Sequence, residues 1–248
     1  MSSLFGSLTN DGLEETTDRV GGFTPLESDI YLGTIKLAYA GESAGGARNV
    51  TLVIDCGGKE HRETVYITNK KGENFYLNKQ DQTKKVPLPG FTTMDDLCLI
   101  VTGKPLAEQE TEDKVVNAWD KDAKREMPKS VKMLSELLDQ EASFAILKSL
   151  ENKSESDGNG GYVTISDTRD VNTIEKVLDT DSKMSVVEAR NGADSSTYWD
   201  SWLSRNQGQT RDKREIKGDA GGNTGRPGQN KAAPQPSAGG ERKSLFGK

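Results

Sequence analysis

The sequence predicts a mainly β protein with a few helices, arranged as a small open barrel with insertions and followed by a disordered C-terminal tail. Three observations support this fold class. Short segments of alternating apolar and polar residues are separated by glycine-bearing turns, which is the pattern of half-buried strands. Only 32% of the 248 residues are hydrophobic, so one globule of this length would have a poorly filled core. Glycine and proline also accumulate near the end of the chain.

Strand signals begin after a polar, glycine-bearing start, so we expect residues 1–28 to form a loosely ordered N-terminal arm. Three successive segments then alternate as strands with one buried face do, namely residues 29–40, 49–56 and 59–68. A slip of the alternation near Gly33 predicts a β-bulge, and the pair Gly57-Gly58 predicts a hairpin turn. The sequence therefore predicts a three-stranded meander.

The middle of the chain combines predicted helices with a further strand. Residues 92–101 are predicted to be helical, with Thr93 as the N-cap ahead of two aspartates. Residues 115–119 are predicted to form a short strand. Residues 130–139 carry Val and Leu side chains at helical spacing, which predicts a second helix.

The last part of the body is predicted to consist of hairpins closed by a helix. Residues 142–150 and 162–165 alternate as strands do and flank a glycine-rich turn. Residues 171–178 and 184–189 are predicted to form a final hairpin. A short amphipathic helix that packs on the barrel is predicted from the spacing of Tyr198, Trp199, Trp202 and Leu203.

Several short strands with an interposed helix favour the OB-fold among small barrels. The OB-fold is a five-stranded, partly open Greek-key barrel that binds nucleic acid on the face of strands 2 and 3 and in adjacent loops. A different β-barrel and an α+β sandwich are the alternatives. We assign the predicted OB-fold-like domain to residues 29–206.

The apolar content collapses in residues 207–248, so we expect this segment to be a disordered Gly/Pro-rich tail. The tail holds nine Lys and Arg against four Asp and Glu, whereas the whole chain has a net charge of -6. The body is therefore acidic and the tail is basic. The tail ends in a Leu-Phe pair beside cations, which predicts a partner-binding tip. The alternative is a chain end without a role. The residues of the predicted tip are Arg242, Lys243, Leu245, Phe246 and Lys248.

The composition argues against an enzyme, a metal site and a cofactor site. A single histidine, His61, leaves no multi-histidine metal site and only one residue for a His-based triad. Cys56, His61 and Cys98 lack the spacing of zinc ligands, and phosphate-loop or nucleophile-elbow motifs are missing. No apolar run is long enough to span a bilayer, and the start does not read as a secretory signal. Two cysteines indicate reduced thiols in a cytoplasm.

The strongest functional signal is a basic segment that contains aromatic residues, at residues 68–85. Lysines can follow phosphates there, and aromatic rings can stack on unpaired bases without reading their sequence. The alternative is a solvated charged loop whose aromatic residues belong to the core. The predicted DNA-binding residues are Lys70, Lys71, Phe75, Tyr76 and Lys79 first, followed by Lys84, Lys85, Arg48, Arg62, Tyr39 and Lys36.

Several blocks of the sequence carry a resemblance to a known family. They are GGFTPLESDIYLGTIKLAYAGESAGGARNVTLVID, ETVYITNKKGENFYLNKQDQTKKVPLPGF, LIVTGKPLAEQ and VVEARNGAD, together with the closing KSLFGK. These blocks resemble the single-stranded DNA-binding proteins of lytic tailed bacteriophages, in particular podophages that package their own RNA polymerase. The likeness extends from about residue 21 to residue 194 and includes the last six residues.

This resemblance implies an OB-fold core that coats single strands during phage DNA replication and recombination in the cytoplasm of the infected bacterial host. It also implies a tail that recruits polymerases or other replication and transcription proteins, and it leaves assembly into homo-oligomers on DNA open. Many single-strand binding proteins end in an acidic tail, whereas this tail is basic. The partner surface should therefore differ from the basic pocket that acidic tips seek.

The sequence thus predicts a non-enzymatic protein that binds single-stranded DNA without sequence preference and uses no metal or cofactor. The alternative from another class is a phage regulatory or scaffold protein that recruits a polymerase or other partner through its tail without binding DNA. A third interpretation is a nuclease or a nuclease inhibitor. A nuclease is disfavoured because the sequence lacks clustered carboxylates and histidines that could bind a catalytic metal.

Overall fold

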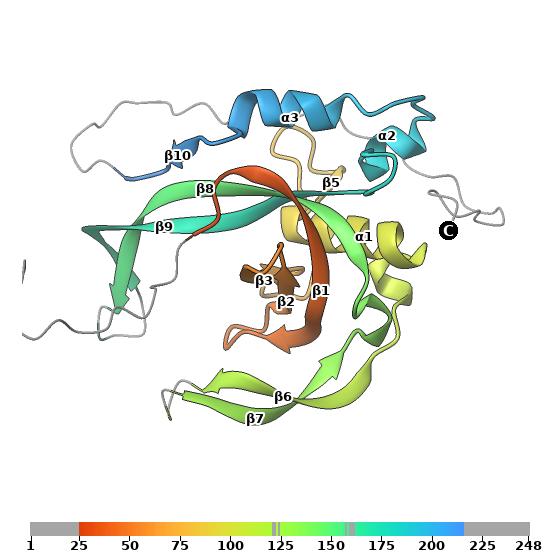
Figure 1. Cartoon of the computed structure of the whole chain (residues 1–248). Coiled ribbons are helices and arrows are strands. Elements are labelled where there is room, and N and C mark those ends of the chain that lie inside the picture. The colour runs from red at the N-terminus through yellow and green to blue at the C-terminus, as the bar shows by residue number, and fades with distance from the viewer. Residues whose placement is uncertain (1–24, 121–122, 124, 157, 159–161, 216–248) are drawn as a thin grey trace, which may run out of the picture.

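The computed structural model describes residues 25–120, 123, 125–156, 158 and 162–215 (Figure 1). Most of the predicted arm at residues 1–28 and the tail from residue 216 onward lie outside the described residues. The predicted partner-binding tip lies there too, at Arg242, Lys243, Leu245, Phe246 and Lys248. Strands dominate the described part, which confirms the prediction of a mainly β protein with a few helices.

Within the described residues, eight strands form one open sheet. Its path runs through β10 (Thr210–Asp212), β8 (Glu141–Ser156), β1 (Asp29–Glu42), β2 (Arg48–Asp55) and β3 (Glu60–Tyr66). Strands β1, β2 and β3 pair antiparallel, as predicted for the meander. The turn at Gly57 and Gly58 joins β2 to β3. Both glycines have a positive φ, which residues other than glycine rarely adopt.

Two hairpins extend this sheet on opposite sides of the meander (Figure 1). Strands β6 (Glu112–Asp120) and β7 (Arg125–Met133) form one hairpin, which joins β1 at Tyr39 and Ala40. The other hairpin consists of β8 and β9 (Tyr162–Leu178). Strands were predicted within β6, β8 and β9, but the structure makes all three much longer.

Strand β1 changes partners along its length. Its first residues pair with β8, and the residues from Thr34 to the end of the strand pair with β2. The bulge lies between Ile35 and Leu37, not near Gly33 where the alternation predicted it. Gly33 serves a different purpose, because a methyl group there would come within 2.8 Å of Phe144 Cδ2. Glycine therefore allows β1 to lie against the aromatic ring of the core.

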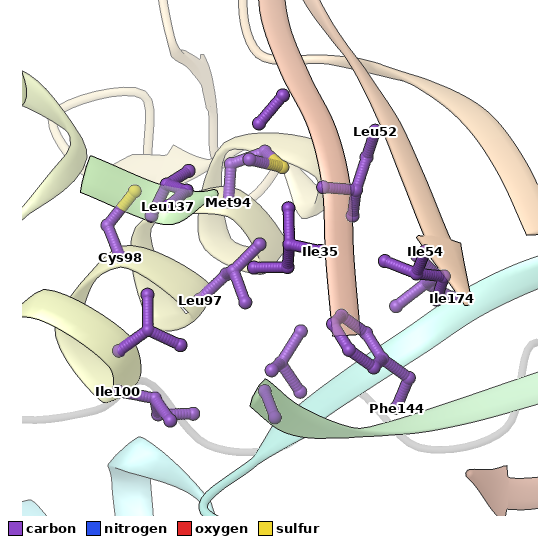
Figure 2. Close-up of a cluster of buried hydrophobic side chains, with 14 of the residues drawn as sticks. Ile35, Leu52, Ile54, Met94, Leu97, Cys98, Ile100, Leu137, Phe144 and Ile174 are labelled. Carbon is purple, nitrogen blue, oxygen red and sulfur yellow. The ribbon is translucent and has the colours of Figure 1, made fainter. Parts of the chain in front are cut away.

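The main core lies between the meander, helix α1 (Pro89–Thr102) and the inner ends of β8 and β9 (Figure 2). Ile35, Leu52 and Ile54 of the sheet meet Leu97 of the helix and Phe144 of β8 in this cluster. All five side chains are fully buried. Burial of a side chain of this size contributes roughly 1.5–3 kcal/mol before the loss of chain entropy is counted. This core fixes the helix against the meander.

Strands β3 and β9 come together without forming a ladder in the described part. β3 is the last strand of the sheet path. The backbone N–H of Ile174 in β9 nevertheless donates to Glu63 Oε2 of β3 at 2.8 Å. The same oxygen is 3.1 Å from His61 Nε2. A side-chain carboxylate thus joins the two strand edges. The sheet curves around the core but does not close into a barrel.

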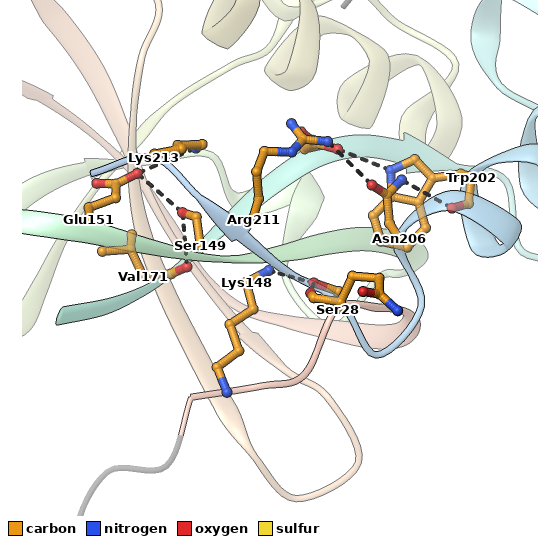
Figure 3. A network of polar contacts seen from close by, with 11 residues as sticks. Ser28, Lys148, Ser149, Glu151, Val171, Trp202, Asn206, Arg211 and Lys213 are labelled. Atoms are coloured by element: carbon orange, nitrogen blue, oxygen red, sulfur yellow. Dashed lines mark hydrogen bonds and ion pairs between the residues drawn. The ribbon is translucent and has the colours of Figure 1, made fainter. Parts of the chain in front are cut away.

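The C-terminal part of the described chain packs across β8 and β9 (Figure 3). Helix α3 (Tyr198–Asn206) buries Trp202 against Ala145 and Leu147 of β8, which confirms the predicted packing helix. Strand β10 then pairs parallel with β8, and Lys213 bonds to Glu151 at its end. Residues 207–215, expected to belong to the tail, include this strand, so the predicted domain boundary at residue 207 differs from the structure.

Two helix predictions from the sequence need correction. Helix α1 begins at Pro89, because proline suits the first helical position, and Thr93 lies inside the helix with its hydroxyl donating to Pro89 O at 3.1 Å. The predicted second helix at residues 130–139 is wrong. Those residues form the end of β7 and a short 3-10 turn, η2 (Ser135–Leu137), since Val131 and Met133 alternate into a small cluster with Tyr39.

The predicted final hairpin is also wrong in its second half. Residues 171–178 belong to β9 as predicted, but the next segment forms helix α2 (Val186–Arg190). Ser185 and Glu188 form a reciprocal capping box at its start, which stabilises a helix rather than a strand. The described residues include no helix with the length and apolar character needed to cross a membrane.

Candidate nucleic-acid interface

The lysine pair Lys70-Lys71 lies on a tight turn at residues 69–73 that follows β3. Asn69 holds this turn, because its Oδ1 accepts the backbone N–H groups of Lys71 at 2.8 Å and Glu73 at 3.0 Å. Its Nδ2 donates to the Glu73 carboxylate at 2.9 Å, which ties up the acidic residue of the turn. Both lysines are exposed. The turn therefore presents two cations on a rigid backbone.

Arg48 and the loop between β1 and β2 lie beside this turn. The Arg48 backbone N–H donates to Thr68 Oγ1 at 2.8 Å, and its carbonyl accepts the N–H of Ile67 at 3.0 Å. A methyl group at Gly45 would come within 3.3 Å of Lys70 Cε. The structure thus brings Arg48, Lys70 and Lys71 together from two separate segments. We call this part of the molecule, residues 43–48 and 66–87, the loop end.

The remaining basic and aromatic residues of the segment lie on a two-stranded ribbon and on the loop, residues 78–84, that joins its strands. Strand β4 (Phe75–Leu77) pairs antiparallel with β5 (Lys85–Pro87). Consecutive strand residues point to opposite faces, so Phe75 and Tyr76 cannot form one continuous stack. Lys85 Nζ lies 4.3 Å from the centroid of the Phe75 ring, whereas 45% of Tyr76 is exposed. Tyr76 therefore offers the more accessible ring.

Two other lysines, in the loop that joins β4 to β5, differ in their surroundings. Lys84 Nζ lies 3.2 Å from the Asp81 carboxylate, and hydrogen bonds from Thr83 and then from Lys84 lower the pKa of Asp81. Lys79 is exposed and forms no ion pair within the described chain. We therefore rank Lys79 above Lys84 as a contact for an anionic ligand.

Tyr66 is a functional candidate that the sequence did not assign to a face. It ends β3 and is 51% exposed. In the register of β2 and β3, Tyr66 pairs with Asn49 and Arg62 pairs with Val53. Tyr66 and Arg62 are four residues apart on β3, so their side chains lie on the same, outer face of the meander. Strand alternation could have identified Tyr66, because it shares a face with Thr64 and with the predicted contact Arg62.

Three predicted contacts lie away from the loop end. Tyr39 is only 9% exposed and packs with Val131 and Met133 of the β7 strand, so its ring is not accessible for stacking and we leave it out of the proposed surface. Lys36 lies near the bulge of β1 and pairs with Asp139 at 3.7 Å. Arg62 is exposed beside Glu60 at 3.9 Å and lies about 13 Å along β3 from Tyr66.

The two cysteines considered for metal binding or nucleophilic chemistry are both buried. Burial raises the pKa of Cys56 to about 11, and burial also raises the pKa of Cys98 in α1. Protonated, buried thiols are poor nucleophiles. The described residues contain no group of three or more His, Cys, Asp and Glu side chains that could hold a metal ion.

Comparison with known proteins adds no assignment. Neither the scan against protein-family models nor the search of curated proteins found a match to this chain.

Proposed function

We propose that this protein binds single-stranded DNA without sequence preference and is not an enzyme. Arg48, Lys70 and Lys71 contact the phosphates at the loop end, and Lys79 and Lys85 extend this cationic track along the ribbon. Tyr66 and Tyr76 stack on unpaired bases. Such contacts tolerate any sequence, because every base has a π-face.

The observation that carries this proposal is the group of unpaired cations at the loop end. Among the described residues, Arg48, Lys70 and Lys71 have no carboxylate partner. They gather in a chain whose net charge is -6, so this local patch opposes the charge of the molecule. Exposed tyrosine rings lie on the adjacent strand end and ribbon. Cations beside flat exposed rings suit a polyanion with accessible bases.

The strand order supports the finer proposal of an OB-fold arrangement. With the β4–β5 ribbon and the β6–β7 hairpin taken as insertions, a meander of three strands is followed by a helix that packs against it and then by two paired strands, β8 and β9, with β8 returning to β1. OB-folds bind nucleic acid with the face of strands 2 and 3 and with neighbouring loops. The loop end contains the turn between β1 and β2 and the end of β3, which are the corresponding parts.

The resemblance to phage single-stranded DNA-binding proteins extends the proposal to the biological role. We propose action in phage DNA replication and recombination in the host cytoplasm. The Leu245-Phe246 tip, outside the described residues, is proposed to recruit a polymerase or another replication or transcription protein.

Titration of a fluorescent poly(dT) oligonucleotide over a range of salt concentrations tests the proposal. The affinity of the wild-type protein should fall steeply with salt, with a slope of about -0.7 for each phosphate neutralised on a single strand. Changing Lys70→Ala and Lys71→Ala together should make the slope shallower by about 1.4, because two phosphate contacts are lost. Duplex DNA of equal length should bind more weakly.

Lys153→Ala is a matched control, because Lys153 is an exposed lysine whose ammonium group lies 3.8 Å from Asp167. It should leave the slope unchanged. Failure to bind poly(dT) in dilute buffer would contradict the proposed function, as would tight and preferential binding of duplex. If both lysine changes at the turn left the slope unaltered, the phosphate track would lie elsewhere.

A further inference from the structure

Strand β3 has one paired edge and one open edge in the part of the chain that the structure describes. β2 pairs with one edge, and β3 is the last strand of the sheet path. β9 meets the other edge at Glu63, whose carboxylate accepts the N–H of Ile174 at 2.8 Å. Before this point the strand is exposed, at Lys59, Glu60 and Arg62. An open strand edge of this kind can pair with a further strand.

The hydrogen bonds between β2 and β3 show which backbone groups face the open edge. The N–H of Cys56 donates to Lys59 O at 2.8 Å, and the N–H of Ile67 donates to the first residue of β2 at 3.0 Å. The register between the two strands has no shift, and hydrogen-bonded pairs alternate with non-hydrogen-bonded pairs along an antiparallel ladder. Odd-numbered residues of β3 therefore bond to β2. The backbone N–H and C=O groups of Glu60 and Arg62 point to the open edge.

The charges on this edge favour pairing with a second copy of the same strand. Glu60 and Arg62 share the outer face of β3, and their side chains are 63% and 37% exposed. If a second β3 runs antiparallel with His61 opposite His61, Glu60 of each copy lies opposite Arg62 of the other, and opposite charges across a strand pair are stabilising. A register centred on Glu60 or on Arg62 would place like charges opposite each other, which is destabilising.

The backbone favours the same register. Residues that face each other in a hydrogen-bonded pair both need backbone groups that point to the shared edge. Glu60 and Arg62 both meet this condition, so each Glu60–Arg62 pair between copies would exchange both of its N–H···O bonds. The backbone and the side chains thus select one register independently of each other.

We propose that two copies of this protein associate antiparallel through the open edge of β3, with Glu60 of each copy facing Arg62 of the other. A twofold contact uses the same surface on both copies, so it closes at a dimer and does not grow into a filament. Few residues take part, so the association is weak compared with a large dimer interface. The proposal goes beyond DNA binding and does not depend on it.

Disulfide trapping of the full-length protein, without DNA, tests the register. Copies that carry Glu60→Cys are mixed with copies that carry Arg62→Cys under a mild oxidant. Facing residues of a hydrogen-bonded pair have Cα atoms about 5.5 Å apart, which a disulfide can span. The native cysteines are buried. We expect a cross-linked dimer in the mixture and little in either variant alone, because identical positions would lie roughly 8–9 Å apart, beyond the reach of a disulfide.

Charge reversal tests the side-chain contribution by sedimentation equilibrium. Glu60→Arg alone and Arg62→Glu alone each place like charges at both pairs, so each should weaken self-association about 10-fold. Mixing the two variants places opposite charges at both pairs again and should restore association. A misfolded variant would not be rescued in this way. Lys79→Glu changes the net charge as Arg62→Glu does, in an exposed loop, and should leave association unchanged.

The outcomes separate this proposal from the proposed function, because neither measurement uses DNA. Absence of cross-linking in the mixture, or equal cross-linking in a single variant, overturns the proposed register. Failure of the two charge variants to associate when mixed, or growth beyond a dimer, overturns it as well. A protein that dimerises as described but does not bind poly(dT) contradicts only the proposed function.

Discussion

The loop end and the opposite helical side use their cations in different ways. On the helical side, formed by α2, α3, β10 and the strands beneath them, several cations are paired with carboxylates of other elements. Lys148 bonds to Glu27 at 2.9 Å and Arg211 bonds to Glu175 at 2.9 Å. At the loop end, Arg48, Lys70 and Lys71 lack such partners within the described chain. These pairs join different elements of the fold on the helical side, whereas the three cations at the lysine turn remain available to a ligand.

The largest expected effect comes from breaking the most buried pair on the helical side. Lys176 Nζ lies 2.6 Å from Asp96, whose side chain is 4% exposed, and burial raises the pKa of Asp96 against the opposing effect of Lys176. Asp96→Ala leaves the lysine without its partner. We expect a loss of about 3 kcal/mol in the free energy of unfolding, measured by urea denaturation. The salt slope of DNA binding should not change, and a changed slope would contradict the division between the two sides.

The next effect concerns the exposed rings at the loop end. Tyr66→Ala with Tyr76→Ala should weaken binding to poly(dT) by about 2 kcal/mol in total, about 1 kcal/mol for each lost stack, measured by fluorescence anisotropy, and leave the salt slope close to wild type. Both side chains are about half exposed, so stability should be nearly unchanged. Tyr39→Phe serves as the control because Tyr39 is buried. If Tyr39→Phe weakened binding and the double change did not, the stacking surface would be wrongly placed.

A smaller effect is expected from acid on the helical side. The Glu188 carboxylate accepts the backbone N–H groups of Ser185 at 2.9 Å, Thr197 at 2.7 Å and Tyr198 at 2.8 Å. Burial opposes ionisation of Glu188, but these hydrogen bonds outweigh it and lower the pKa from 4.5 to about 2.

A depressed pKa stabilises the fold above pH 4.5, and this contribution is lost as the pH falls toward 2. We expect it to amount to about 1–2 kcal/mol after solvent screening. Thermal unfolding of wild type and Glu188→Gln at pH 7 and pH 3 measures it. The difference in Tm between the two proteins should shrink at pH 3, and an equal or larger difference would contradict the assignment.

The smallest effect should come from an exposed pair on the helical side. Lys213 Nζ lies 3.3 Å from Glu151 with 39% of the lysine side chain exposed. Lys213→Ala should change the free energy of unfolding by less than about 1 kcal/mol and leave the salt slope unaltered. A slope reduced as much as by the change at Lys70 and Lys71 would show that DNA contacts reach this side.

Local patterns predicted the meander and the lysine turn because both depend on neighbouring residues. Alternation identified β1, β2 and β3, and paired glycines identified the turn between β2 and β3. The final hairpin was predicted wrongly although Ser185 and Glu188, at capping-box spacing, indicated the start of a helix. A capping box is local and identifies the helix start, whereas the strand-like alternation of residues 184–189 does not correspond to a strand.

Other features depend on contacts that no local pattern contains. Tyr39 looked like an exposed ring of a strand, but the β6–β7 hairpin, about ninety residues later in the chain, covers it with Met133. The cavity lined by Arg48, Val50, Phe91 and Leu106 likewise needs α1 and the segment after it to come against the meander. Proximity of this kind follows from the tertiary fold.

The carboxylate of Glu63 connects the two edges of the curved sheet through a side chain rather than through paired backbones. A ladder between β3 and β9 would fix the circumference through a row of backbone bonds, whereas here one side chain spans the two edges at Ile174. Side-chain torsions change more readily than strand register. The distance between β3 and β9 can therefore change by rotation about the side-chain bonds of Glu63, while every strand keeps its paired neighbours.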